Sequence, residues 1–241
     1  MRHLVFMLAI VVGLAGTAAA QDMAWSTIIP SVAGTDVLGL HLRELMQRSQ
    51  QATGNAQHPT EPSAAPVSAD LRFTPSKERR AANISAFVAQ SRRLNQQEAD
   101  RLAALFASTD VFGQMEATLA GVGLRIDDVS DVYALWCITA WSAVRGRNDT
   151  PSRMMAMAVK AQIAQAISSS GTLRGANDAV KQELAESLLL KAALIDAIVE
   201  KAKSNPEQLK TVQAAMIRAG QGMGFDLAGM NLTDHGFIPL H

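Results

Sequence analysis

Apolar residues fill nearly the whole circumference of one stretch of the chain, residues 129–144, which reads VSDVYALWCITAWSAV. Asp131 is its only charge, and it contains Trp136 and Trp141, two of the chain's three tryptophans. A helix that is apolar nearly all round in a water-soluble chain is normally central and covered by its neighbours. The pattern therefore predicts a buried central helix over residues 129–144.

Amphipathic stretches flank this segment on both sides, and each begins at a residue type that caps helices. No stretch shows the alternation typical of a strand, so the chain is predicted to be all-α. We expect a single helical bundle of about six or seven helices around the central one. The expected starts of the flanking helices are Thr74, Asn95, Thr109, Thr150, Asn177 and Asn205.

The first 20 residues have the pattern of a signal peptide: a short basic start, an apolar run and a small-residue site at Ala18–Ala20. The apolar run is shorter than the roughly 20 residues that a membrane span needs. We therefore expect cleavage and a periplasmic or secreted protein, the alternative being an uncleaved anchor. No later stretch is long and apolar enough to span a membrane.

The rest of the chain divides into segments that differ in their pattern of polar and apolar residues. Prolines set among Ala, Ser and Thr predict an extended linker, and the final residues lack a helical period. The predicted segments are the signal peptide 1–20, an N-terminal segment 21–53 with an amphipathic helix over 36–51, a linker 54–70, a helical domain 71–224 and an irregular tail 225–241.

Leu38, Leu42 and Leu45 share one face of the helix predicted over 36–51. The linker tethers this helix to the domain. It can dock back onto the domain or present its leucines to another protein, and the sequence leaves both open.

Composition limits the classes of partner and the source of stability. Removing 20 of the 241 residues leaves 221, with 21 basic and 22 acidic side chains and a net charge of −1. This balance argues against nucleic acid or an anionic membrane surface as the main partner. Cys137 is the only cysteine, so no internal disulfide forms. Stability must come from burial, for which 48% apolar residues are ample.

Several short motifs occur over roughly residues 71–237, and they are Phe73-Thr74-Pro75-Ser76, Arg79, Arg80, Asn83, Phe87, Tyr133 to Trp136, Trp141, Pro151-Ser152-Arg153, Thr233 and Gly236-Phe237. Together they resemble a domain-of-unknown-function family of bacterial proteins. The resemblance implies an exported, helical protein, and it assigns no activity or catalytic residue. It draws attention to Arg79 and Arg80 as ligand-binding candidates.

Three carboxylates, Asp127, Asp128 and Asp131, cluster at the start of the central helix. Such a group can hold a metal or perform acid–base chemistry. The simpler interpretation is that Asp128 caps the helix while all three oppose its positive end. We favour the cap because no nearby His or Glu completes a ligand set.

Other candidate residues have simpler structural explanations. Cys137 lies mid-helix on the buried face, which favours an inert core thiol. His41 and Glu44 form only one of the several pairs that a helical metal site needs. The methionines could bind Cu(I), but they also fill helical cores. Glu186-Ser187 matches a dipeptide of some peptidoglycan-cleaving enzymes and is explained better by chance. We predict no metal and no cofactor.

The leading functional hypothesis is a non-enzymatic interaction or binding module of the cell envelope. The chain has neither a G-x-S-x-G elbow nor an H-E-x-x-H helix. One alternative is a carrier of a small apolar ligand bound beside Trp136 and Trp141. The other is a carboxylate-dependent hydrolase that uses Asp127, Asp128 or Asp131.

Overall fold

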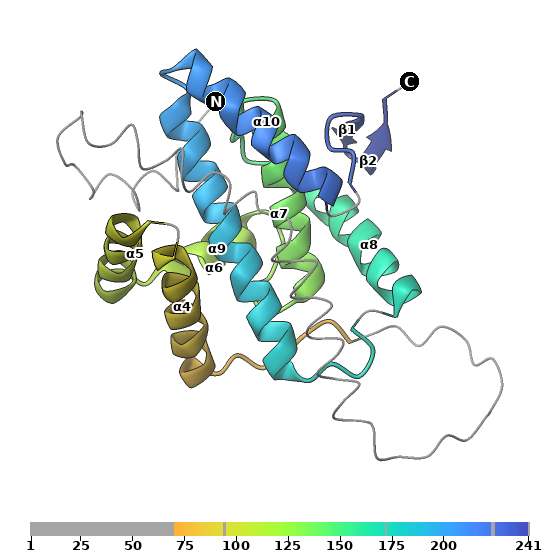
Figure 1. The fold of residues 1–241 in the computed structure, drawn as a ribbon. Helices are drawn as coiled ribbons and strands as arrows, with labels where there is room; N and C mark the ends of the chain where they lie inside the picture. Colours follow the sequence, from red (N-terminus) through yellow and green to blue (C-terminus); the bar gives the residue numbers. More distant parts are fainter. Residues whose placement is uncertain (1–69, 94, 172, 223–224, 241) are drawn as a thin grey trace, which may run out of the picture.

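The computed structural model describes residues 70–93, 95–171, 173–222 and 225–240. Over this part the chain forms seven helices and one two-stranded antiparallel sheet, which confirms the all-α bundle (Figure 1). The elements are α4 (Lys77–Arg92), α5 (Gln96–Ser108), α6 (Val111–Gly121), α7 (Val129–Val144), α8 (Arg153–Ser170), α9 (Asp178–Ala202), α10 (Pro206–Gly222), β1 (Met230–Thr233) and β2 (Gly236–Pro239).

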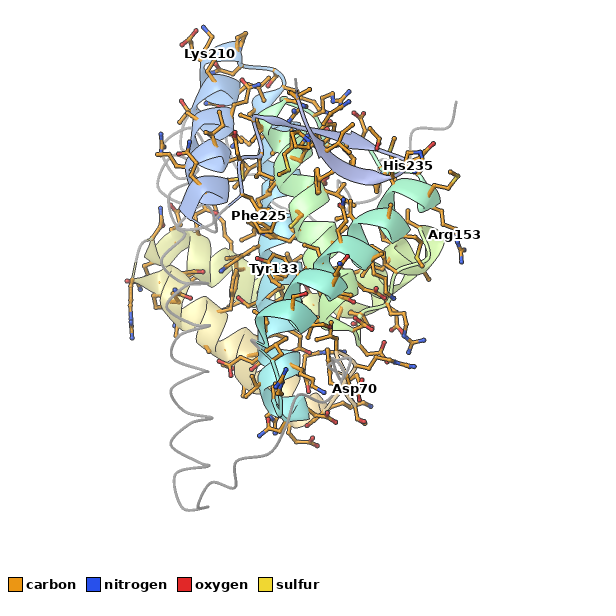
Figure 2. The ribbon with its side chains drawn as sticks, turned by 90° about the vertical axis from the view of Figure 1, so that its right-hand side faces the viewer. Asp70, Tyr133, Arg153, Lys210, Phe225 and His235 are labelled. Carbon is orange, nitrogen blue, oxygen red and sulfur yellow. The ribbon has the colours of Figure 1, made fainter. Side chains whose placement is uncertain are left out.

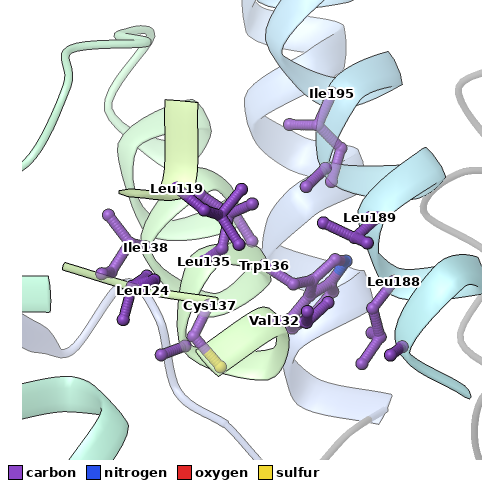
Figure 3. Packing of buried hydrophobic residues seen from close by; sticks show 14 of the residues in the cluster. Leu119, Leu124, Val132, Leu135, Trp136, Cys137, Ile138, Leu188, Leu189 and Ile195 are labelled. Carbon is purple, nitrogen blue, oxygen red and sulfur yellow. The ribbon is translucent and has the colours of Figure 1, made fainter. Parts of the chain in front are cut away.

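Helix α7 is the centre of the bundle, as its apolar circumference predicts. It packs against α8, α9 and α10, while α4 covers the opposite side of α9 and packs against α5 (Figure 1). Trp136 is only 2% exposed. Figure 3 shows its ring between Val132 on its own helix and Leu188 and Leu189 on α9. The buried central helix is therefore confirmed.

Side-chain caps set the starts of the helices. Asp128 caps α7 and Asn177 caps α9, as predicted. Two predicted caps are wrong by two residues, because the hydroxyls of Ser76 and Ser152 accept the capping bonds of α4 and α8. The backbone N–H of Thr74 instead donates to Asp178.

Residues 71–73 join the start of α4 to the start of α7. The N–H of Phe73 donates to the carbonyl of Asp127 at 3.0 Å, and the N–H of Val129 donates to the carbonyl of Leu71 at 2.9 Å. Leu71 and Phe73 are both buried. The described chain therefore begins packed against the first turn of the central helix.

The expectation that residues 225–241 lack regular structure is wrong for residues 230–239, which form the hairpin of β1 and β2. Thr233 pairs with Gly236 around a two-residue turn, and Gly236 has a φ of 92°, which favours glycine. A hairpin this small is marginal alone. Side chains of α7 and α8 bind the hairpin and hold it in place. No local sequence pattern predicts these contacts.

The signal peptide, the helix predicted over 36–51 and most of the linker lie outside the described residues. Among the helices that the structure describes, none has the length and apolar character needed to cross a membrane.

Candidate functional site

The three aspartates predicted as an acidic candidate lie together at the start of α7, and each has its own partner. Asp127 accepts two hydrogen bonds from the guanidinium of Arg125, at 2.8 and 2.7 Å. Arg72 lies 3.8 Å from the same carboxylate. The hydrogen bonds from Arg125 hold the pKa of Asp127 below its usual value. Asp127 is therefore an ion-paired surface carboxylate.

Asp128 performs the capping role. Its Oδ1 accepts from the backbone N–H and the hydroxyl of Ser130, at 2.9 and 2.6 Å, and from the N–H of Asp131 at 3.4 Å. These donors include amides of the first turn, which have no partner within the helix. The Asp128 carboxylate therefore binds the first turn of α7.

Asp131 is fully buried and pairs with Lys160 of α8. Its Oδ2 accepts from the backbone N–H of Arg125 at 2.8 Å, and its Oδ1 lies 2.5 Å from the Lys160 ammonium. Burial raises the pKa of Asp131, and the bond from Lys160 partly opposes this effect. The pair fastens α8 to the start of α7. In the described part of the chain, no three His, Cys, Asp or Glu side chains are placed to hold a metal ion.

Arg80 binds the buried carboxylate of Glu186, a contact that the sequence does not predict. Its Nε donates to Oε1 of Glu186 at 2.8 Å, and Nδ2 of Asn83 donates to Oε2 at 2.6 Å. Gln182 completes the group with a bond to Oε1 at 3.0 Å. Glu186 is 1% exposed, so this polar cluster lies inside the α4–α9 interface. Arg79, the neighbouring candidate, is half-buried and takes no part in the cluster.

The two tryptophans proposed as ligand-binding residues face different surroundings. The indole N–H of Trp136 is buried and has no acceptor in the described structure. That of Trp141 donates to the carbonyl of Met230 on β1 at 2.9 Å. Arg145 stacks 4.1 Å above the Trp141 ring and donates to the same carbonyl. Trp141 and Arg145 therefore bind the hairpin at β1. They do not form one site with Arg80.

Both edges of the hairpin are engaged by side chains. The amide of Gln162 on α8 receives the N–H of Phe237 at 2.9 Å and donates to its carbonyl at 3.0 Å. These bonds occupy the outer edge of β2, while Trp141 and Arg145 occupy β1 at Met230. An edge blocked in this way resists addition of another strand.

The residues that carry the family resemblance have structural roles. Arg80 and Asn83 hold Glu186, Ser152 caps α8, and the ring of Phe237 packs 6.4 Å from that of Trp141. The motifs therefore account for how helices and hairpin are joined.

One group of side chains stands out by exposure. In the described chain the exposed large hydrophobic residues are Met154 and Met157 on α8, at 61% and 38%, with Ile238 and Leu240 at 42% and 55%. Helix α8 packs against β2, and Figure 2 shows α8 and the hairpin on the same side of the molecule. We call these four residues the α8–β2 patch.

The sequence predicts neither this patch nor the structural role of Glu186. The sequence favours core positions or Cu(I) binding for the methionines, and no signal marks Ile238 as a strand residue or Leu240 as exposed. On a helical wheel Glu186 lies opposite Leu184 and Leu188, where a carboxylate is expected to be solvated, so the sequence does not predict its burial. No spacing in the sequence predicts its partner Arg80, which lies more than 100 residues earlier in the chain.

Three buried titratable groups with shifted pKa values lie apart from the patch. Asp196 of α9 is mostly buried beside Glu200 and Asn148, and burial raises its pKa to about 6. Lys191 is 7% exposed, and burial lowers its pKa to about 8. Cys137 is buried in the core, and burial raises the pKa of its thiol.

The chain matches one known protein family. The sequence model of the "Family of unknown function (DUF6683)" matches residues 1–238, and the chain belongs to this family. Neither the curated proteins nor the solved structures give a match. The family description names no reaction, so function has to be argued from the residues.

Proposed function

For a member of this family, we propose the role of an exported, non-enzymatic binding module of the cell envelope that engages a partner protein through the α8–β2 patch. Export is supported by the sequence pattern of residues 1–20. The carrying observation is that three of the four exposed large hydrophobic side chains of the described chain lie on α8 and β2, which are in contact, and the fourth, Leu240, directly follows β2. Contiguous exposed apolar residues mark interaction sites.

The free energy available at such a patch is substantial. Burying an exposed Met, Leu or Ile side chain fully is worth about 1.5–3 kcal/mol. The blocked edges of the hairpin exclude strand addition at Phe237 and at Met230. The partner therefore contacts side chains, and a helix laid along α8 fits this geometry.

The charged candidates favour a scaffold role over catalysis. Asp127, Asp128 and Asp131 bind Arg125, the first turn of α7 and Lys160 respectively. Arg80 binds Glu186 in an interface. Among the described residues, the α8–β2 patch is an exposed apolar surface that these pairings do not involve.

Photo-crosslinking in the producing cell tests this proposal. A photoreactive amino acid at position 157 or 238 should give the same protein adduct, and one at the exposed Lys210 of α10 should not. Introducing Asp at Ile238 should remove the adduct formed from position 157. Equal adducts from positions 157 and 210 would contradict the proposal.

A carrier of a small apolar ligand is a second candidate, which one observation favours. The buried N–H of Trp136 has no acceptor in the described structure, and a ligand oxygen would supply one. Native mass spectrometry of the purified protein should then show a retained ligand, whereas a mass equal to that of the bare chain would exclude the carrier role.

A further inference from the structure

The outward face of α8 carries almost no charge. After Arg153, its exposed residues are Met, Ala, Gln and Ser, and the half-buried Lys160 is paired with Asp131. Met154, Met157, Ala161 and Gln165 follow one another at spacings of three and four residues, so they form one stripe along the helix. An exposed helix face is normally charged, and a stripe of this kind is typical of a surface that another helix covers.

We infer that the chain's own segment 36–51 docks along this stripe and covers the α8–β2 patch until a partner displaces it. The inference rests on the proposed function, because it concerns regulation of the same surface. The sequence places Leu38, Leu42 and Leu45 on one face of the helix predicted for this segment. On the same helical wheel Arg43, Glu44 and Arg48 fall outside that face, so docking leaves no charge opposite the uncharged stripe.

The point where the described chain begins lies close to α8. Asp70 is two residues before Arg72, whose backbone pairs with that of Asp128 in an isolated bridge. Asp128 caps α7, and Asp131 in the first turn of α7 binds Lys160 in the middle of α8. The preceding segment therefore joins the domain beside the start of α7, to which Lys160 of α8 is paired.

The predicted linker is long enough to return the segment to α8. Residues 54–69 would span about 22 Å on average as a flexible chain and up to about 55 Å when extended. Tethering over such a distance gives an effective concentration in the millimolar range. A second copy of the chain would reach the stripe only at its bulk concentration, which is far below the millimolar range. Tethering therefore favours the chain's own segment over a second copy.

The rate of methionine oxidation measures directly whether segment 36–51 covers Met154 and Met157. The full chain is treated with hydrogen peroxide, and the rates for Met154 and Met157 are read by peptide mass spectrometry. Leu42→Glu should raise both rates about three- to tenfold, the protection expected when a millimolar tether exceeds a weak dissociation constant by that factor. The matched control Gln47→Glu adds the same charge on the opposite face of the predicted helix and should leave the rates unchanged. The buried Met216 reports that the fold is intact.

The outcomes separate this inference from the proposed function. Equal rates in the Leu42→Glu and Gln47→Glu chains overturn the docking, even if the adduct from position 157 persists. Protection that is lost on dilution means that the segment covers a second copy, which also overturns it. If Leu42→Glu raises the rates and no adduct forms from position 157, the docking stands and the proposed function fails.

Discussion

The Nε of Arg80 donates to Oε1 of Glu186 at 2.8 Å, which joins α4 to the centre of α9. The two residues have unequal exposure, with 29% of the Arg80 side chain accessible and 1% of that of Glu186. Asn83 and Gln182 bind the same carboxylate. The group therefore neutralises a buried charge inside an otherwise apolar interface.

Arg80→Leu should lower the free energy of unfolding by about 2–3 kcal/mol, because it leaves the buried carboxylate of Glu186 without its cation. The expected loss is below that for a fully buried pair because Asn83 and Gln182 still donate. Arg92→Leu, which removes the exposed pair with Asp100, should cost less than about 0.5 kcal/mol. Urea unfolding measures both. Equal losses in the two variants would show that the Arg80 pair contributes no more than a surface pair.

Asp128→Ala should cost about 1–2 kcal/mol of stability, the usual loss when a helix cap is removed. Asp128→Asn keeps an acceptor oxygen and should retain most of this stability. Thermal unfolding of the two variants gives the difference. A stable Asp128→Ala chain that has lost a hydrolytic activity would instead support the hydrolase alternative.

Asp196 makes stability depend on pH. Its pKa in the folded state is about 6, above the ordinary value of 3.8, so the folded state binds more protons than the unfolded state between these values. The contribution of Asp196 to stability is therefore lost as pH rises from about 4 to about 6, by up to about 3 kcal/mol. Asp196→Asn should be the more stable protein at pH 7 and should match the parent near pH 4. A difference that does not change with pH would contradict this assignment.

Cys137 should be inert in the native protein, because the thiolate is the reactive form and burial raises the pKa of this thiol. Ellman's reagent should label it only in urea. The rate of labelling without denaturant should then follow global unfolding. Rapid stoichiometric labelling of the folded chain would show that the thiol is accessible.

The sequence predicts best where one local property decides the structure. The bounds of α7 agree with the expected 129–144, because the segment is apolar all round and starts at an aspartate cap. The core position of Cys137 follows from the same wheel. The shift of two helix starts from Thr74 and Thr150 to Ser76 and Ser152 arises because hydroxyls on both sides of a proline are suitable caps.

Long-range contacts decide what the sequence could not predict. The hairpin strands are four residues long, too short for their period to be recognised, and Trp141, Arg145 and Gln162 hold them from other elements. The pairing of Asp131 with Lys160 joins residues on different helices. Exposure of Met154 and Met157 depends on which face of α8 meets α7, which a helix rich in Ala and Met does not specify.

The central claim is that buried polar pairs hold the fold while the α8–β2 patch meets the partner. The most direct measurement is the double variant Met157→Glu/Ile238→Glu, assayed for urea unfolding and for its adduct from a photoreactive group at position 154. The free energy of unfolding should fall by no more than about 1.5 kcal/mol, because both side chains are exposed and only the docking of segment 36–51 is lost, and the adduct should vanish. An adduct that persists in a fully folded variant would contradict the account.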